Sequence, residues 1–177
     1  NPSTLQIQGE LTYSSWIYIN GYTNHSGIMG RGHGASGNHS TKASMLMVTP
    51  EGKVSFEISN GYDAVNITST SILLLNEWYY VVATWDGTTS VNSLKIYING
   101  ILDNYDSSNI TFINLNPSDQ NYFKLGSRDN YSTGNAYGYF NGKLDNSNVW
   151  NYELDSLEIQ IFYESNPIGN EVGLVGY

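Results

Sequence analysis

The chain contains no cysteine, and only 7 of its 177 residues are lysine or arginine. Without cysteine there is no disulfide framework, no thiolate metal site and no cysteine nucleophile. The few basic residues stand against 16 aspartates and glutamates, which gives a formal net charge of −9 at pH 7. With no basic run either, the sequence lacks a phosphate-binding surface, and this excludes a nucleic-acid partner.

Long apolar runs are missing as well. No stretch approaches the roughly 18 apolar residues that span a bilayer, so we expect no membrane insertion. Hydrophobic residues still make up 40% of the sequence, which excludes a disordered chain. The length indicates one domain with a full core, covering residues 1–177. We expect about 164–177 to be a linker or the opening strand of a following repeat.

What the chain does have is Asn, Ser, Thr, Gly and Tyr, while the helix formers Ala, Lys and Glu are scarce. Ser, Thr and Asn favour turns and caps, and Tyr, Ile and Val favour pleated surfaces. Period-two alternation then marks the strands. Over 11–20 one face is mostly apolar, whereas the other carries Thr12, Ser14, Trp16, Tyr18 and Asn20.

Two turn signals separate pairs of expected strands. Pro50–Lys53 lies between strands at about 44–49 and 53–59, and Asn99-Gly100 lies between 93–98 and 101–105. Asn-Gly supplies the two positive φ values that a type I′ hairpin needs. We expect further strands at 27–31, 64–68, 110–113, 121–126 and 138–150. The near-continuous apolar strand 77–85 is typical of a sheet covered on both faces.

About a dozen strands without intervening helices predict an all-β sandwich of two sheets. The segment 154–163 breaks the pattern, because its apolar residues follow helical spacing. Asp155 and Glu158 have the spacing of a capping box, in which each side chain accepts from the other residue's backbone N–H. We therefore predict one short C-terminal helix.

Five motifs follow one another in a characteristic order along the chain. They are Leu11–Ile17 (LTYSSWI), Asn76–Gly87 (NEWYYVVATWDG), Leu94–Gly100 (LKIYING), Lys124–Ser127 (KLGS) and Phe140–Ile159 (FNGKLDNSNVWNYELDSLEI). Together they resemble the laminin-G-like and pentraxin-like branch of the concanavalin-A-like lectin/glucanase superfamily. The resemblance covers roughly residues 10–163 and implies a jelly-roll sandwich of two antiparallel sheets.

The resemblance raises an enzymatic alternative. Glu153, Asp155 and Glu158 match the Glu-x-Asp-x-x-Glu spacing of retaining glucanases that share the jelly roll. Such enzymes need carboxyl groups roughly 5–5.5 Å apart across a concave sugar cleft. Here the pattern falls in the helical segment after the last strand, so we interpret Asp155 and Glu158 as caps and expect no catalytic residue.

Calcium is the cofactor that the sequence suggests, in a structural role. Pentraxin-like members carry an acidic calcium loop after Leu-Gly, where this chain has Arg128, Asp129 and Asn130. A cation at Arg128 opposes a two-calcium site, but a single Ca²⁺ on Asp129 and Asn130, with Asp145, stays open. His25, His33 and His39 match no metal-ligand spacing.

Tyrosine is the most suggestive surplus. Aromatic faces stack on the apolar faces of sugars, and planar polar groups hydrogen-bond hydroxyls. The tyrosine-rich loop, residues 128–141, has both kinds of group, whereas the four tryptophans fall within expected strands and are assigned to the core. The candidate carbohydrate-binding residues are Arg128, Asp129, Asn130, Tyr131, Asn135, Tyr137 and Tyr139.

The sequence thus favours a non-catalytic, lectin-like carbohydrate-binding or adhesion module of a larger extracellular protein, secreted or at the cell surface. Its partner would be a glycan or cell-surface polysaccharide, and further domains would share the parent chain. The absence of cysteine fits oxidising surroundings. The main alternative is a protein-binding or structural spacer domain of the laminin-G type, and a retaining glycoside hydrolase ranks last.

Overall fold

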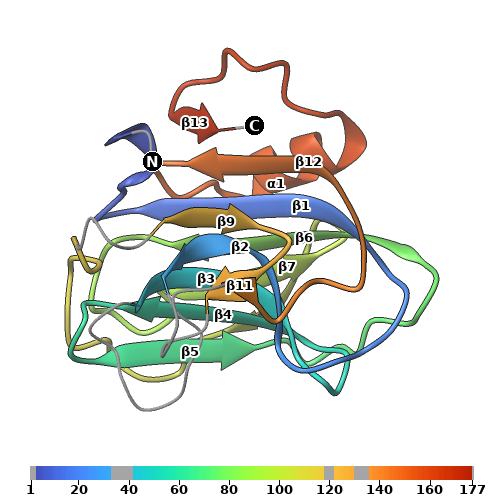
Figure 1. Cartoon of the computed structure of the whole chain (residues 1–177). Helices are drawn as coiled ribbons and strands as arrows, with labels where there is room; N and C mark the ends of the chain where they lie inside the picture. Colours follow the sequence, from blue (N-terminus) through green and yellow to red (C-terminus); the bar gives the residue numbers. More distant parts are fainter. Residues whose placement is uncertain (1–2, 33–41, 118–121, 130–135, 177) are drawn as a thin grey trace.

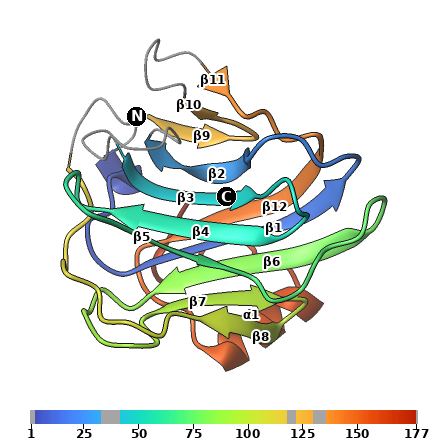
Figure 2. The ribbon, with the colours of Figure 1, turned by 90° about the horizontal axis from the view of Figure 1, so that it is seen from below.

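The alternating segments form antiparallel strands that stack as two main layers (Figure 1; Figure 2). A computed structural model describes residues 3–32, 42–117, 122–129 and 136–176. The all-β sandwich is therefore confirmed, and it is consistent with a jelly roll. In the described ranges, no helix has the length and apolar character needed to cross a membrane.

The larger layer has six strands in the order β13-β12-β1-β6-β7-β8, with every neighbouring pair antiparallel. Its central pair, β1 and β6, lies between strands on both sides. The six strands are β1 (Leu11–Ile19), β6 (Trp78–Trp85), β7 (Leu94–Ile98), β8 (Ile101–Tyr105), β12 (Gly142–Trp150) and β13 (Leu174–Gly176).

The smaller layer has five strands in the order β5-β4-β3-β2-β9, again antiparallel throughout. A separate two-stranded ribbon, β10-β11, lies beside β2. The strands are β2 (Ser26–Gly32), β3 (Lys42–Val48), β4 (Val54–Ser59), β5 (Ala64–Thr68), β9 (Phe123–Leu125), β10 (Arg128–Asp129) and β11 (Ala136–Tyr137), and a 3₁₀ turn, η1 (Ser3–Leu5), precedes β1.

The predicted Asn99-Gly100 turn is confirmed, since both residues have positive φ, 52° and 80°. Gly100 is also needed for space. A Cβ atom on Gly100 would lie 2.8 Å from Gln160 Oε1 of the helix α1 (Ser156–Glu164). The turn therefore lets the β7–β8 hairpin approach the helix closely.

The described residues form two apolar clusters. The main core lies between the sheets and takes the inward faces of both, for example Ile17, Phe56 and Trp85. A second cluster lies on the outer face of the six-stranded sheet, where Tyr80, Val82 and Trp150 pack under α1. Strand β6 is thus covered on both faces over much of its length, as its continuous apolar sequence predicts.

The helix begins where the sequence predicts. Asp155 Oδ1 accepts from the backbone N–H groups of Leu157 and Glu158, both at 2.8 Å, and Glu158 Oε2 accepts from Asp155 N at 2.8 Å. This reciprocal capping box satisfies donors that the first helical turn would leave unpaired. The helix ends at Ser165, whose N–H donates to the carbonyl oxygen of Ile161.

Two segments differ from expectation or extend it. No strand forms over 110–113; this described segment is a loop whose Ile110 and Phe112 pack into the main core, so burial rather than pairing explains its apolar residues. The segment from 164 onward includes β13, which pairs with β12 at the edge of the larger sheet. A following repeat stays a prediction.

Candidate functional site

The described start of the tyrosine-rich loop, on β10, lies beside β2 of the five-stranded sheet, and Arg128 turns inward. Arg128 on β10 pairs with Tyr137 on β11 and is only 8% exposed. Its guanidinium carbon lies 5.2 Å from the centre of the Tyr137 ring. Burial lowers the pKa of Arg128. The arginine is therefore a packed residue of the β10-β11 ribbon rather than an open hydrogen-bond donor.

The remaining residues of this loop are only partly described. Tyr137 and Tyr139 are exposed, with Tyr139 at 66%. Asp129 is placed on β10 by its backbone pairing with Ala136. Asn130, Tyr131 and Asn135 lie outside the described residues. A carbohydrate site on this loop stays a prediction.

The candidate calcium residues fall on different layers. Asp129 lies on β10 beside the smaller sheet, whereas Asp145 lies on β12 of the larger one. Over the described ranges, no three or more His, Asp or Glu residues gather in a group that could hold a metal ion. Of the three histidines, only His25 is described. Calcium binding stays a prediction.

The three residues of the glucanase-like pattern, Glu153, Asp155 and Glu158, all make structural contacts. Glu153 Oε1 accepts from Lys95 Nζ at 2.6 Å and from Thr84 Oγ1 at 3.1 Å. Burial alone would lower the pKa of Lys95, but its hydrogen bond and ion pair with Glu153 outweigh burial and raise the pKa. Asp155 and Glu158 form the capping box described above, so the interpretation of these two residues as caps is confirmed.

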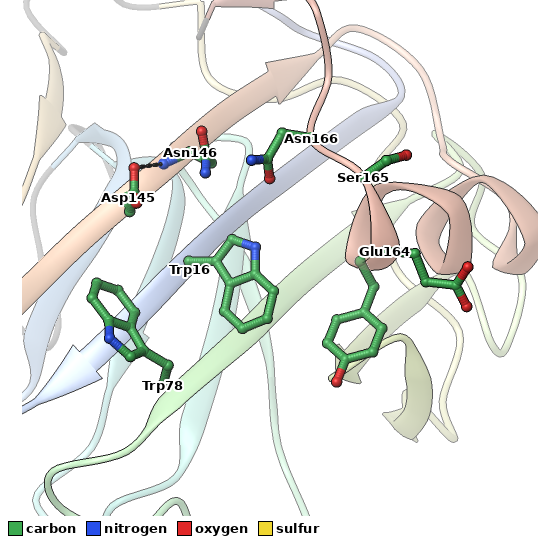
Figure 3. Close-up of a pocket in the computed structure, with 8 residues that line it drawn as sticks. Trp16, Trp78, Asp145, Asn146, Glu164, Ser165 and Asn166 are labelled. Carbon is green, nitrogen blue, oxygen red and sulfur yellow. Dashed lines mark hydrogen bonds between the residues drawn. The ribbon is translucent and has the colours of Figure 1, made fainter.

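A different site appears on the outer face of the six-stranded sheet, where the end of α1 approaches β1, β6 and β12 (Figure 3). We call this site the aromatic groove. Its volume is about 500 Å³, within the range of small-ligand sites. It is lined by Trp16, Trp78, Asp145, Asn146, Tyr163, Glu164, Ser165 and Asn166.

The rings of the groove come from three elements and lean on further aromatic side chains. Trp16 on β1 stacks on Tyr163 of the helix, with ring centres 5.6 Å apart and planes at 24°. Trp16 also contacts the buried Tyr80, with ring centres 5.5 Å apart. Trp78, 42% exposed at the start of β6, contacts Tyr18 at 5.5 Å. The partly exposed rings of the groove are thus packed against other aromatic side chains on their inner side.

A β-bulge in β12 supplies the polar wall opposite the helix. Ser14 pairs with Asn148 and Trp16 with Asp145, so β12 has one extra residue between these pairs. Asn146 takes a φ of 44°, a conformation that Asn tolerates better than most residues. Bulges redirect side chains. Figure 3 shows Asp145 and Asn146 above the Trp16 ring.

Hydrogen bonds fix the bulge. The amide N–H of Asn146 donates to Asp145 Oδ1 at 2.9 Å, and Asn148 Nδ2 donates to the carbonyl oxygen of Asn146 at 2.8 Å. Across the strand pair, Ser15 Oγ donates to the carbonyl oxygen of Asp145 at 3.3 Å. The polar wall is therefore held by backbone contacts rather than by a free loop.

The sequence interpretation placed all four tryptophans in the core, which is right for Trp85 and Trp150 but wrong for Trp78. Trp16 is half-buried and also lines the groove. Strand alternation carried the signal for Trp16, because this residue shares a face with Thr12, Ser14, Tyr18 and Asn20. The pattern alone does not locate a surface site, because Thr12 and Ser14 on the same face are fully buried.

The chain belongs to the concanavalin A-like lectin/glucanases superfamily, since a family model of that description matches residues 1–160. The predicted resemblance is thereby confirmed. No curated protein matches the sequence.

Solved structures share the fold at low identity. A protein from Bacteroides ovatus, described as a candidate carbohydrate-binding protein, is 22% identical with a TM-score of 0.71, over 94% of this chain and 44% of its own. The chain thus spans less than half of that protein. The CBM40 module of a Ruminococcus gnavus sialidase, bound to α2,3-sialyllactose, is 18% identical with a TM-score of 0.69, over 91% of this chain and 85% of its own.

A heptameric pentraxin from Limulus polyphemus is 17% identical, with a TM-score of 0.66, and the match covers 93% of this chain and 74% of the pentraxin. At these identities the likeness concerns the fold. Function has to be argued from the side chains of the site itself.

Proposed function

We propose that the chain is a non-catalytic carbohydrate-binding module, and that the aromatic groove is its binding site. The observation that carries this proposal is the juxtaposition of the Trp16 and Trp78 rings with the polar wall at Asp145 and Asn146. Sugar rings have apolar faces and hydroxyl edges, so a site for them combines aromatic planes with groups that accept or donate hydrogen bonds.

The fold relatives support the same class of function. The B. ovatus protein is described as a candidate for carbohydrate binding, and the R. gnavus module was crystallised with a sialylated sugar. The non-catalytic part of the proposal is supported by the capping roles of Asp155 and Glu158 and the ion pair of Glu153. These contacts occupy the carboxylates that a glucanase mechanism would require.

A glycan array, followed by titration calorimetry on the sugars it identifies, tests the proposal. Trp78→Ala should weaken binding at least tenfold, since it removes one aromatic plane that is already exposed. The matched control is Tyr62→Ala, because Tyr62 is an 87% exposed ring between β4 and β5, outside the groove. This control should bind as the unmodified domain does.

Two outcomes would contradict the proposal. Silence across the array, with and without Ca²⁺, would favour the protein-binding or spacer alternative. Binding that is lost in Tyr139→Ala but kept in Trp78→Ala would keep the carbohydrate function and move the site to the tyrosine-rich loop.

We also propose that the module acts outside the cell, as part of a larger protein that contacts cell-surface polysaccharide. Support comes from the absence of cysteine and from the acidic, neutral-polar composition. Fractionation of the producing cells, with an antibody against this domain, should recover it in the medium or at the surface. Recovery only from the cell interior would contradict this part of the proposal.

A further inference from the structure

The aromatic groove has an acidic character. Asp145 on the β12 bulge and Glu164 at the end of α1 both line it, and both are exposed. Its other polar lining groups, from Asn146, Ser165 and Asn166, are neutral. None of the lining residues is basic, so the fixed charges of the groove have one sign.

The helix adds to this negative potential. The C-terminal end of α1 reaches the groove at Glu164, and the last helical turn has no basic residue. The unpaired carbonyl groups at a helix C-terminus carry partial negative charge and favour cations, an effect confined to the last turn. Two side-chain carboxylates and a helix end thus act together.

The cations near the groove are directed elsewhere. Lys143 Nζ lies 5.0 Å from the centre of the Tyr18 ring, and Lys143 does not line the groove. Lys95, on the neighbouring β7, is paired with Glu153. Neither lysine is among the residues that line the groove.

Aromatic faces favour the same kind of ligand. A cation over the face of Trp or Tyr is attracted by the ring quadrupole, and Trp is the strongest partner. Figure 3 shows Trp16 between Trp78 and the helix end, with Asp145 near the two rings and the Glu164 carboxylate directed away from them. Glu164 Oε1 accepts a hydrogen bond from Gln160 Nε2 at 3.1 Å. A ligand lying on these rings would therefore meet π faces below and the Asp145 carboxylate at one edge, with Glu164 and the helix end contributing negative potential from farther away.

Resting on the proposed carbohydrate function, we infer that the aromatic groove prefers an amine-bearing saccharide of the glucosamine type and disfavours anionic sugars. The sugar ring would stack on Trp16 and Trp78, and its protonated amine would pair with Asp145, while Glu164 would add to the negative potential. Sialyllactose, the ligand of the R. gnavus module, carries a carboxylate that this groove would repel.

Calorimetric titration with a glucosamine tetramer, its N-acetylated counterpart and sialyllactose tests the inference, since the first two differ chiefly in charge. The glucosamine tetramer should bind about fivefold more tightly than the acetylated form at low ionic strength. Added salt should reduce that ratio, because both carboxylates are exposed. Sialyllactose should not compete for the groove.

Charge-removing variants locate the effect. Asp145→Asn combined with Glu164→Gln keeps the shape of the wall and should bring the affinity ratio of the two tetramers close to one. Glu51→Gln is the matched control, because Glu51 is an exposed carboxylate on the turn between β3 and β4. In this control the ratio should stay at the value of the unmodified domain.

Equal affinity for both tetramers in the unmodified domain would overturn the inference, and so would an unchanged ratio in the double variant or displacement by sialyllactose. Failure of both tetramers to bind would overturn it too. In each case the glycan array decides separately whether the carbohydrate function itself survives.

Discussion

The aromatic groove and the tyrosine-rich loop contain similar residue types, but they hold them differently. In the groove, Trp16, Trp78 and Tyr163 come from two central strands and a capped helix. In the loop, Tyr137 sits on a two-residue strand and Tyr139 follows it at 66% exposure. Regular elements can keep a large ring half-exposed without letting it move, and this fixes the geometry of a platform.

The largest expected effect is the difference in stability between losing a buried tryptophan and losing an exposed tryptophan of the groove. Trp150 is fully buried under the helix and stacks on Phe162 at 5.5 Å. Trp150→Ala should lower the free energy of unfolding by about 3–5 kcal/mol, as large cavities do. Trp78→Ala should lower it by less than about 1 kcal/mol. Urea denaturation of both variants measures the difference, and equal losses would show that Trp78 is a core residue.

The next effect tests whether Arg128 serves the fold or a ligand. Its guanidinium packs over Tyr137 and its stem is buried. Arg128→Met should destabilise the domain by about 1–2 kcal/mol through lost cation–π and polar contacts. Thermal melting and sugar titration should be run on the same sample. A loss of sugar affinity with no loss of stability would return the binding site to the tyrosine-rich loop.

A smaller effect concerns the N-terminal cap of the helix whose other end borders the groove. Asp155→Ala removes the side chain that accepts from two N–H groups of the first helical turn. The free energy of unfolding should fall by about 1 kcal/mol. Leu157→Ala is a suitable comparison, since Leu157 is an exposed residue of the same turn. If both variants lose the same stability, the capping box contributes nothing beyond helix propensity.

The smallest effect at neutral pH comes from Tyr80, the ring beneath Trp16. Burial raises the pKa of Tyr80 to about 12, above its ordinary value of 10. A raised folded-state pKa gives stability that is complete below pH 10 and is lost as pH rises from 10 through 12. Tyr80→Phe should therefore lose less stability over that window. Urea denaturation of the unmodified domain and of Tyr80→Phe at pH 8 and pH 11.5 measures the free energy of unfolding lost between the two pH values. Equal losses in the two proteins would show that Tyr80 does not contribute.

Strand alternation and turn chemistry predicted most of the fold. The apolar period of two places Ile17 inward and Trp16 outward, and Asn99-Gly100 fixes one hairpin. The strand predicted at 110–113 was wrong, because the apolar residues of this segment are buried in a loop. Period alone does not distinguish a paired strand from a loop that closes the end of a sandwich.

The candidate site was harder to predict because it joins residues far apart in the chain. Trp16 and Trp78 meet only through the β1–β6 pairing, and Tyr163 arrives with the helix. The bulge that orients Asp145 depends on one extra residue in β12, which the sequence GKLDN does not reveal. Arg128 likewise looked available for ligands, although tertiary packing buries it.

The stacking of Trp16 on Tyr163 also has a kinetic consequence. A ring held between a strand and a helix loses little rotamer freedom when a ligand arrives, whereas a free side chain would lose roughly 0.5–1.5 kcal/mol. The groove is thus preorganised, and binding needs no closure step. Association should follow simple collision with the sugar, so affinity differences between sugars will be expressed mainly in how long each one stays bound.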